Sequence, residues 1–359
     1  MNSFINSLQE RIRAAQASHS PLVIQGGNTK AFYGTKSIGE AIDMRGYAGV
    51  IDYQPRELVL TVRAGTPLAD IEALMEGERQ MLPFEPPHFA SGATIGGTVA
   101  AGLSGPRRAY AGAIRDFVLG TRIINGKGED LHFGGRVIKN VAGYDVSRLM
   151  VGALGTLGIL LDLSFKVLPK PAAEATLRFE MDEAGAIQRV NEWAGQPLAL
   201  SASYWFEGVT MLRLSGTNAG VAAAKQKLGG DEVAGSEASE FWQSLRDHKH
   251  TFFQAANQTL KPLWRLSVPA TTPPIPIASM PLHEWGGALR WFAADIDAAT
   301  LRKQIAAVGG HATLIHARGS NATVFHPIEG KLAELNRNLK FAFDPANVLN
   351  RGRLDNVSR

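Results

Sequence analysis

Pro21-Leu22-Val23-Ile24-Gln25, followed by Gly26-Gly27-Asn28-Thr29-Lys30, is the stretch that decides the fold. Its first half is rich in β-forming residues, and its second half ends that strand with two glycines. Glycine reaches backbone conformations in which successive N–H groups can point at one anion. Taken alone, the stretch is typical of a tight turn, and a phosphate-binding loop is the alternative. The candidate ligand residues are Gly26, Gly27, Asn28, Thr29 and Lys30.

A second glycine-rich stretch, Ser91-Gly92-Ala93-Thr94-Ile95-Gly96-Gly97-Thr98, comes about seventy residues later. Small residues let a backbone approach a flat ligand closely, while hydroxyls and amides bind the edge of that ligand. Tight helix packing on small residues is the alternative. The density of glycine at a predicted strand–helix junction favours the ligand.

Two common nucleotide-binding motifs are absent. The sequence has no GxxxxGK[ST], and the pattern nearest to GxGxxG, Gly152-Ala153-Leu154-Gly155-Thr156-Leu157-Gly158, has a different spacing. The residues therefore exclude a P-loop or a Rossmann fingerprint.

The pattern of predicted strands and helices changes at Pro169-Lys170-Pro171. Two prolines cannot continue a central strand, so the segment marks a boundary. Before this point, strands are predicted at 21–25, 49–53, 58–62, 117–124 and 159–168. From 172 to 329, strands and helices alternate in two βαββ-like halves that would form one sheet covered by helices. A helix over 330–339 and an irregular tail follow. The predicted fold class is α+β.

Composition narrows the function classes. At 359 residues the chain is long for one core, and its 45% hydrophobic and 19% charged residues are those of a soluble globular protein. The net charge is only +4, without a basic run, so no nucleic-acid partner is expected. The absence of cysteine excludes iron–sulfur ligation by this chain. We expect no signal peptide, and no apolar stretch reaches the roughly 20 residues that span a bilayer.

The order of these motifs carries a resemblance. Together with Lys139-Asn140-Val141-Ala142-Gly143-Tyr144-Asp145 and Gly155-Thr156-Leu157-Gly158-Ile159, the two glycine stretches resemble the FAD-binding domain of the vanillyl-alcohol oxidase (p-cresol methylhydroxylase, PCMH) family. The 139–145 segment and the closing Asn350-Arg351-Gly352-Arg353 are similar to the glycolate oxidase branch, and the short length points to the smaller of its flavin-binding subunits. The motifs cover about the first 170 residues and the last fifteen.

The resemblance implies an architecture and a set of roles. It implies a two-subdomain FAD domain over 1–171, a smaller α+β cap over 172–329, and a segment over 330–359 that returns to the FAD domain. Residues 26–30 would hold the pyrophosphate. The residues of the second stretch that would line the pyrophosphate and the isoalloxazine are Gly92, Thr94, Gly96, Gly97 and Thr98. The further cofactor-binding residues that it implies are Gly112, Ala113, Asp116, Gly155, Gly158, Ile159, Asn350 and Arg353. Lys139, Tyr144 and Asp145 would lie beside the flavin and are the candidate catalytic residues, with an ordinary loop as the alternative.

Three departures from the family bear on function. The pyrophosphate loop has no His and the chain has no Cys, so FAD is expected to be non-covalent. Leu154 stands where many relatives have Glu. The His-rich metal motif of the family's hydroxy-acid dehydrogenases is missing, and His311 and His316 are predicted on opposite faces of one strand, so no metal site is expected.

The function that the resemblance implies is that of a flavin-carrying subunit of a glycolate oxidase-like complex. Its partners would be a larger homologous flavoprotein, which would hold the 2-hydroxy acid, and an iron–sulfur subunit. A cytoplasmic location is expected, with peripheral attachment to the membrane through partners left open. One alternative is a self-sufficient hydroxy-acid dehydrogenase that uses Arg265, Arg290, Arg318 or His316 in the cap. Another is a flavin-free scaffold.

Overall fold

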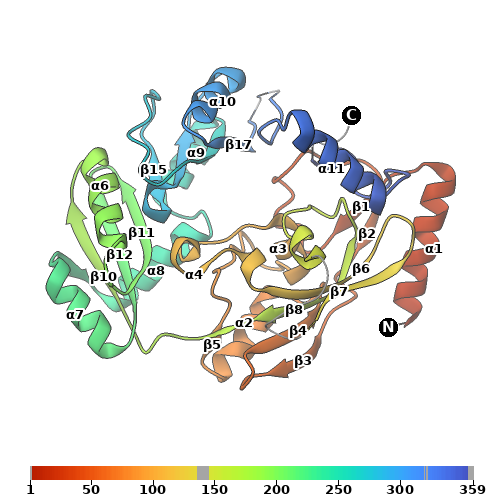
Figure 1. Cartoon of the computed structure of the whole chain (residues 1–359), viewed down its shortest axis with the longest axis horizontal. Helices are drawn as coiled ribbons and strands as arrows, with labels where there is room; N and C mark the ends of the chain where they lie inside the picture. Colours follow the sequence, from red (N-terminus) through yellow and green to blue (C-terminus); the bar gives the residue numbers. More distant parts are fainter. Residues whose placement is uncertain (1, 136–144, 319, 321, 355–359) are drawn as a thin grey trace. The chain divides into compact units, whose positions relative to one another are not determined.

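The computed structural model describes residues 2–135, 145–318, 320 and 322–354 (Figure 1). By its internal contacts the chain divides into two compact units. Unit 1 comprises Met1–Leu103, Ala113–Pro169 and Pro327–Arg359, and unit 2 comprises Ser104–Gly112 and Lys170–His326.

Unit 1 begins with a helix packed on a parallel strand pair. Strand β1 (Leu22–Gln25) pairs in parallel with β2 (Glu40–Asp43), and α1 (Asn2–Ser18) lies beside them (Figure 1). The apolar residues of α1 recur at helical spacing, so one face is buried. That face packs against Leu22 and Ile42, and it consists of Ile5, Leu8, Ile12 and Ala15.

The centre of unit 1 is an antiparallel five-stranded sheet. Its strand order is β3-β4-β8-β6-β7. The strands are β3 (Val50–Gln54), β4 (Val59–Arg63), β6 (Val118–Ile124), β7 (Asp130–Gly134) and β8 (Ile159–Lys166). Each strand predicted in this half of the chain is present within one or two residues of its expected bounds. Apolar residues of the sheet and of two helices, α2 (Leu68–Gly77) and α3 (Ile95–Ala101), form the main core.

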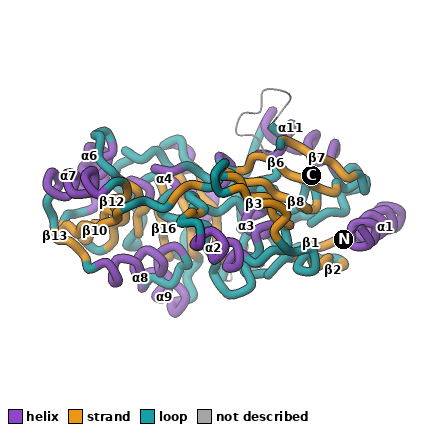
Figure 2. Tube along the Cα trace, turned by 90° about the horizontal axis from the view of Figure 1, so that it is seen from below, coloured by secondary structure: helices purple, strands orange, loops and turns teal. Residues whose placement is uncertain are grey.

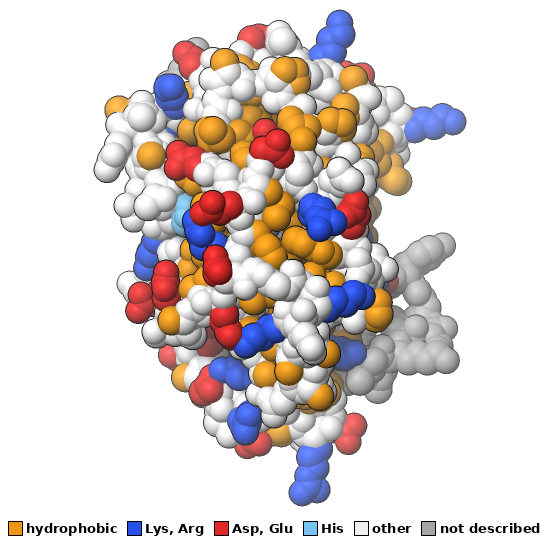
Figure 3. Space-filling view, turned by 90° about the vertical axis from the view of Figure 1, so that its left-hand side faces the viewer, with side chains coloured by type: hydrophobic (Ala, Val, Ile, Leu, Met, Phe, Trp, Pro, Cys, Tyr) orange, Lys and Arg blue, Asp and Glu red, His pale blue; other side chains and the backbone are white. Residues whose placement is uncertain are grey.

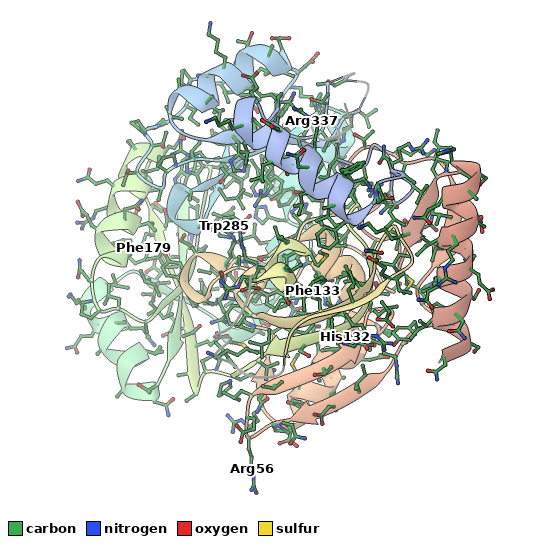
Figure 4. All side chains as sticks on the ribbon, turned by 45° about the vertical axis from the view of Figure 1, so that its right-hand side comes forward. Arg56, His132, Phe133, Phe179, Trp285 and Arg337 are labelled. Carbon is green, nitrogen blue, oxygen red and sulfur yellow. The ribbon has the colours of Figure 1, made fainter. Side chains whose placement is uncertain are left out.

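Shorter elements complete unit 1. They are β5 (Gln80–Met81), which pairs with β9 (Leu168–Pro169), the 3₁₀ turn η1 (Ile114–Asp116), α5 (Val146–Leu149) and the C-terminal helix α11 (Gly330–Phe343). Phe343 of α11 packs against Phe133 of β7, which Figure 4 labels, with ring centroids 6.2 Å apart. The polypeptide therefore returns to the unit in which it began.

Unit 2 is built on one antiparallel eight-stranded sheet. Its strand order is β13-β10-β12-β11-β15-β16-β14-β17. Figure 2 shows α6 and α7 on one side of this sheet and α8 and α9 on the other. The strands are β10 (Ala173–Glu180), β11 (Leu200–Phe206), β12 (Val209–Gly216), β13 (Asp231–Val233), β14 (Leu263–Ser267), β15 (Leu282–Glu284), β16 (Leu289–Ala293) and β17 (His311–His316). The helices are α4 (Arg108–Ala111), α6 (Glu183–Ala194), α7 (Asn218–Leu228), α8 (Gly235–Arg246), α9 (Thr251–Thr259), η2 (Trp285–Gly287) and α10 (Ala298–Ala307).

The second half of unit 2 departs from the predicted βαββ order. Helix α10 comes after β14, β15 and β16 rather than after the first strand. Strand β15 was missed because the prolines and glycines of 269–288 break up the apolar pattern, and β16, which follows directly, was missed with it. The single sheet covered by helices is as predicted. On the face that Figure 3 shows, Lys and Arg are interspersed with Asp and Glu around apolar side chains.

One segment lies in a different unit from the one its sequence position indicates. Ser104–Gly112 comes between two parts of unit 1 in the chain but packs within unit 2. The indole Nε1 of Trp285 donates to the carbonyl oxygen of Gly105 at 3.1 Å, and Arg107 pairs with Glu174 at 2.6 Å. Long-range partners of this kind leave no signal in the local sequence.

Candidate functional site

Unit 1 contains a pocket of about 330 Å³, a size within the usual range for ligand sites. It lies where the end of β1, the start of α3, the 154–158 loop and the C-terminal segment meet. The residues predicted as cofactor ligands that line it are Gly26, Gly27, Asn28, Thr29, Lys30, Thr94, Gly96, Gly97, Gly155, Gly158, Asn350 and Arg353. Four stretches that are far apart in the sequence are therefore brought to one cavity.

The first glycine loop presents backbone donors. The N–H groups of Gly26, Gly27, Asn28 and Thr29 have no acceptor within the described parts of the chain. Asn28 has a φ of 58°, in the left-handed region that turns such a loop back on itself. Four successive donors at the end of a buried strand are the arrangement that a phosphate group requires.

The two glycine stretches touch each other directly. A Cβ on Gly27 would overlap the carbonyl oxygen of Gly92, so the loops approach as closely as two backbones can. Gly92 has a φ of 88° and does not line the pocket. Gly92 therefore contacts Gly27 and does not contact the pocket.

Helix α3 lines the pocket with one face, and its N-terminal N–H groups do not point to the pocket as free donors. Thr94 caps the helix, because its Oγ1 accepts from the N–H of Gly97 at 3.2 Å. The N–H of Gly96 donates to the carbonyl of Ala64 at 2.8 Å. These donors are occupied within the protein. Thr98 is fully buried and does not line the pocket, since it lies about 100° around the helix from Gly97.

The 154–158 loop and the strand after it form one wall. Gly155, with a φ of 71°, and Gly158 line the pocket. Strand alternation points Leu160 to the pocket and Ile159 to the opposite side. Ile159 is instead fully buried in the core between α1 and the parallel strand pair.

The remaining predicted ligands lie elsewhere. Gly112 falls in unit 2. The N–H of Ala113 donates to the carboxylate of Asp116 at 2.8 Å across the short η1 turn, and neither residue lines the pocket. Among the candidate catalytic residues, Lys139 and Tyr144 lie outside the described residues. Asp145 is exposed, caps α5 and pairs with Arg148 at 2.9 Å.

The electrostatics of the pocket favour an anion. Lys30, Lys36 and Arg353 line it, and no Asp or Glu occurs among the described residues that do so. Lys30 is only 9% exposed, and its ammonium lies 5.5 Å from the ring centre of Phe89. Burial lowers the pKa of the Arg353 guanidinium below its ordinary value.

Several residues at the site were missed by sequence reasoning. Lys36 and Ser37 line the pocket, and the buried hydroxyl of Ser37 has no hydrogen-bond partner in the described structure. The other missed residues are mainly apolar or small: Val23, Ile24, Gln25, Ala31, Met44, Ala64, Ala100, Ala101, Leu154 and Leu160. Spacing could have identified Ala100 and Ala101, which lie three and four residues after Gly97 on the same helix face.

These residues fit FAD. The four N–H donors and the two lysines suit a pyrophosphate, the apolar wall suits a flat ring, and the unpartnered Ser37 hydroxyl provides a further polar contact. Among the described residues, the pocket contains no carboxylate that would repel the phosphates.

The cap residues considered for an independent hydroxy-acid site already make contacts with other groups of this chain. The buried guanidinium of Arg290 donates to the carbonyls of Thr272, Pro273 and Gly287, and Arg318 donates to the carbonyls of Ala256 and Lys261. The Arg265 guanidinium lies 5.2 Å from the ring centre of Trp285, a residue labelled in Figure 4. Burial lowers the pKa of His316 to about 4. Within the described residues, no three His, Asp or Glu side chains gather as a metal site would need.

Comparison with known proteins agrees with this geometry. The FAD binding domain family matches residues 5–134. The chain is 45% identical over 351 residues to the glycolate oxidase subunit GlcE of Escherichia coli (strain K12), covering 98% of this chain and 97% of that one. It is 31% identical over 159 residues to the glycolate oxidase subunit GlcD of Bacillus subtilis (strain 168), covering 44% of this chain and 34% of that one.

The fold is also similar to a solved structure. Alkyldihydroxyacetonephosphate synthase matches 96% of this chain with a TM-score of 0.63 at 14% identity, over 75% of its own length. The predicted α+β fold of FAD-binding oxidase type is confirmed. None of the described helices is both long and apolar enough to cross a membrane.

Proposed function

Because the chain belongs to the family of the glycolate oxidase subunit GlcE and is an FAD-binding oxidoreductase subunit, we propose that its unit 1 pocket holds FAD non-covalently. The observation that carries this proposal is the set of four N–H donors at 26–29 beside Lys30 and Lys36, in a pocket whose described lining has no carboxylate. The chain would serve a glycolate oxidase complex as a flavin-carrying subunit.

Different residues of the pocket would bind the pyrophosphate and the ring of FAD. The Gly26–Thr29 amides and Lys30 would hold the pyrophosphate, and Lys36 would add charge at the pocket edge. Ala100, Ala101 and Leu160 would exclude water from the ring. Bound FAD would supply the two-electron redox chemistry, so the contribution of the protein is binding, orientation and electrostatics.

Non-covalent attachment is supported by the residue types present. The chain has no cysteine, and the described residues that line the pocket include neither His nor Tyr. These are the side chains that could form a bond to the flavin ring.

We further propose that the chain acts with a larger homologous flavoprotein subunit and an iron–sulfur subunit. Iron–sulfur clusters are held by Cys thiolates, which this chain lacks. The 2-hydroxy acid would bind the larger subunit, since Arg290 and Arg318 already bind backbone carbonyls. The complex would be cytoplasmic, with any attachment to the membrane made through the partners.

Anaerobic reduction tests whether the 2-hydroxy acid reacts at this chain or at the larger subunit. The purified chain alone, mixed with glycolate, should keep its flavin absorbance, whereas the purified complex should lose it within the turnover time. Rapid bleaching of the lone chain by glycolate or D-lactate would show a self-sufficient dehydrogenase. A colourless chain in a complex that remains active would show a scaffold.

A further inference from the structure

The side chain of Arg353 closes the far end of the glycine loop. Its guanidinium donates to four backbone carbonyls in the six residues that follow Thr29. The acceptors are Lys30 at 3.4 Å, Ala31 at 3.2 Å, Tyr33 at 2.8 Å and Thr35 at 3.3 Å. The N–H of Thr35 returns a bond to the carbonyl of Arg353 at 3.1 Å.

Asn350 closes the near end of the same loop. Its Oδ1 accepts from the N–H of Ile24 at 2.8 Å, and its Nδ2 donates to the carbonyl of Leu154 at 2.6 Å. The residue is 5% exposed, and each of its side-chain polar atoms makes an intramolecular bond. Its backbone N–H donates to Leu22 at 2.9 Å. Asn350 therefore fixes the strand from which the loop emerges.

A loop that must offer its N–H groups to a ligand cannot use them to hold its own shape. Gly26–Thr29 has no backbone acceptors for these groups in the described structure, so its shape must be imposed from outside. The polar groups of Asn350 and Arg353 impose it, one at each end.

We infer that Asn350 and Arg353 are positioning residues, which preorganise the loop through intramolecular bonds and do not bind the flavin through their polar atoms. The inference rests on the proposed function, because it concerns the same pocket. It assigns the C-terminal segment a role in the rate at which flavin enters the site.

Arg353→Met, with Arg353→Lys as the milder variant, tests this role in the full-length chain. A lysine ammonium cannot reach four carbonyls spread over six residues, so Arg353→Lys should lie between Arg353→Met and wild type. Arg351→Met is the matched control. Its guanidinium donates to Asn347 at 2.7 Å and to His19 at 3.3 Å, and it does not line the pocket.

Stopped-flow flavin fluorescence on the apo-protein separates positioning from contact. If the loop must be in its competent shape before FAD enters, Arg353→Met lowers the association rate constant tenfold or more and changes the dissociation rate constant less than threefold. Arg351→Met leaves both constants within twofold. A raised dissociation rate constant with an unchanged association rate constant would show direct contact and overturn the inference.

Hydrogen exchange on the apo-protein gives a readout that does not depend on flavin. In Arg353→Met, the amides of 31–35 should exchange at least tenfold faster, while those of β10 in unit 2 should not change. Equal protection in variant and wild type would also overturn the inference. If wild-type chain binds no FAD, the proposed function fails, and the exchange result still decides whether Arg353 orders the loop.

Discussion

The side-chain amide of Asn350 donates a hydrogen bond to the carbonyl oxygen of Leu154 at 2.6 Å. Leu154 has a φ of 50°, a left-handed conformation that costs a branched side chain free energy. The bond holds this strained residue at the wall of the pocket. The turn at Asn350 therefore shapes two walls of the site.

Asn350→Ala should destabilise unit 1. It leaves the carbonyl of Leu154 and the N–H of Ile24 without partners, at a cost of about 2 to 4 kcal/mol. Thermal unfolding of the apo-protein would measure this cost as a lower Tm. Asn336→Ala, on the exposed side of α11, is the control and should be close to neutral. A drop of equal size in both variants would contradict a specific role for Asn350.

Gly27→Ala tests the contact between the two glycine stretches. The new Cβ would overlap the carbonyl oxygen of Gly92, and the loops would have to separate at a cost of about 2 to 3 kcal/mol. We expect a lower Tm and loss of FAD binding in a fluorescence titration. Gly77→Ala has open space around its Cβ at the end of α2, and it should be neutral or stabilising by about 0.5 kcal/mol. An unchanged FAD affinity in Gly27→Ala would show that the loops do not meet.

Thr94→Ala removes the cap of α3. The N–H of Gly97 loses its acceptor, which should cost about 1 kcal/mol. Thr94→Ser keeps the oxygen and should retain most of the stability. Urea unfolding followed by circular dichroism distinguishes the two, and equal loss in both would assign the effect to the methyl group.

The sequence predicted the parts of the site that depend on local pattern, and it missed those that depend on distant partners. Glycine-rich loops at strand ends and the periodicity of α3 are local features, so Gly26–Lys30 and Thr94–Gly97 could be predicted. Period-two alternation places Ile159 on the face opposite Leu160, and the helical rotation places Thr98 away from Gly97, so local pattern also accounts for their position outside the pocket.

Lys36, Ser37 and the polar atoms of Arg353 could not be placed in the same way. The path of residues 31–37 is set by bonds from Arg353, more than three hundred residues away in sequence. The packing of Ser104–Gly112 in unit 2 rests on Trp285 and Glu174. No local pattern records contacts of this range.

His250 should make unit 2 sensitive to acid. Its Nδ1 accepts from the N–H of Phe252 at 3.2 Å to cap α9, and burial lowers its pKa from 6.5 to about 4. Between these two values the unfolded chain binds more protons, so stability is fully present above pH 6.5 and is lost as pH falls towards 4. His250→Asn keeps a cap acceptor and should reduce this loss by about 1 to 2 kcal/mol, allowing for solvent screening.

Urea unfolding at several pH values checks the effect. Exposed His132→Asn is the control and should reproduce the wild-type dependence. If His250→Asn loses as much stability as wild type between pH 6.5 and 4, another group is responsible.

Acid precipitation of the purified chain tests non-covalent FAD binding most directly, because it measures both the presence and the attachment of flavin. We expect FAD to appear in the supernatant in stoichiometric amount and the denatured chain to have the mass of the polypeptide alone. A colourless supernatant, or flavin that remains with the precipitated chain, would contradict non-covalent binding of FAD by this chain.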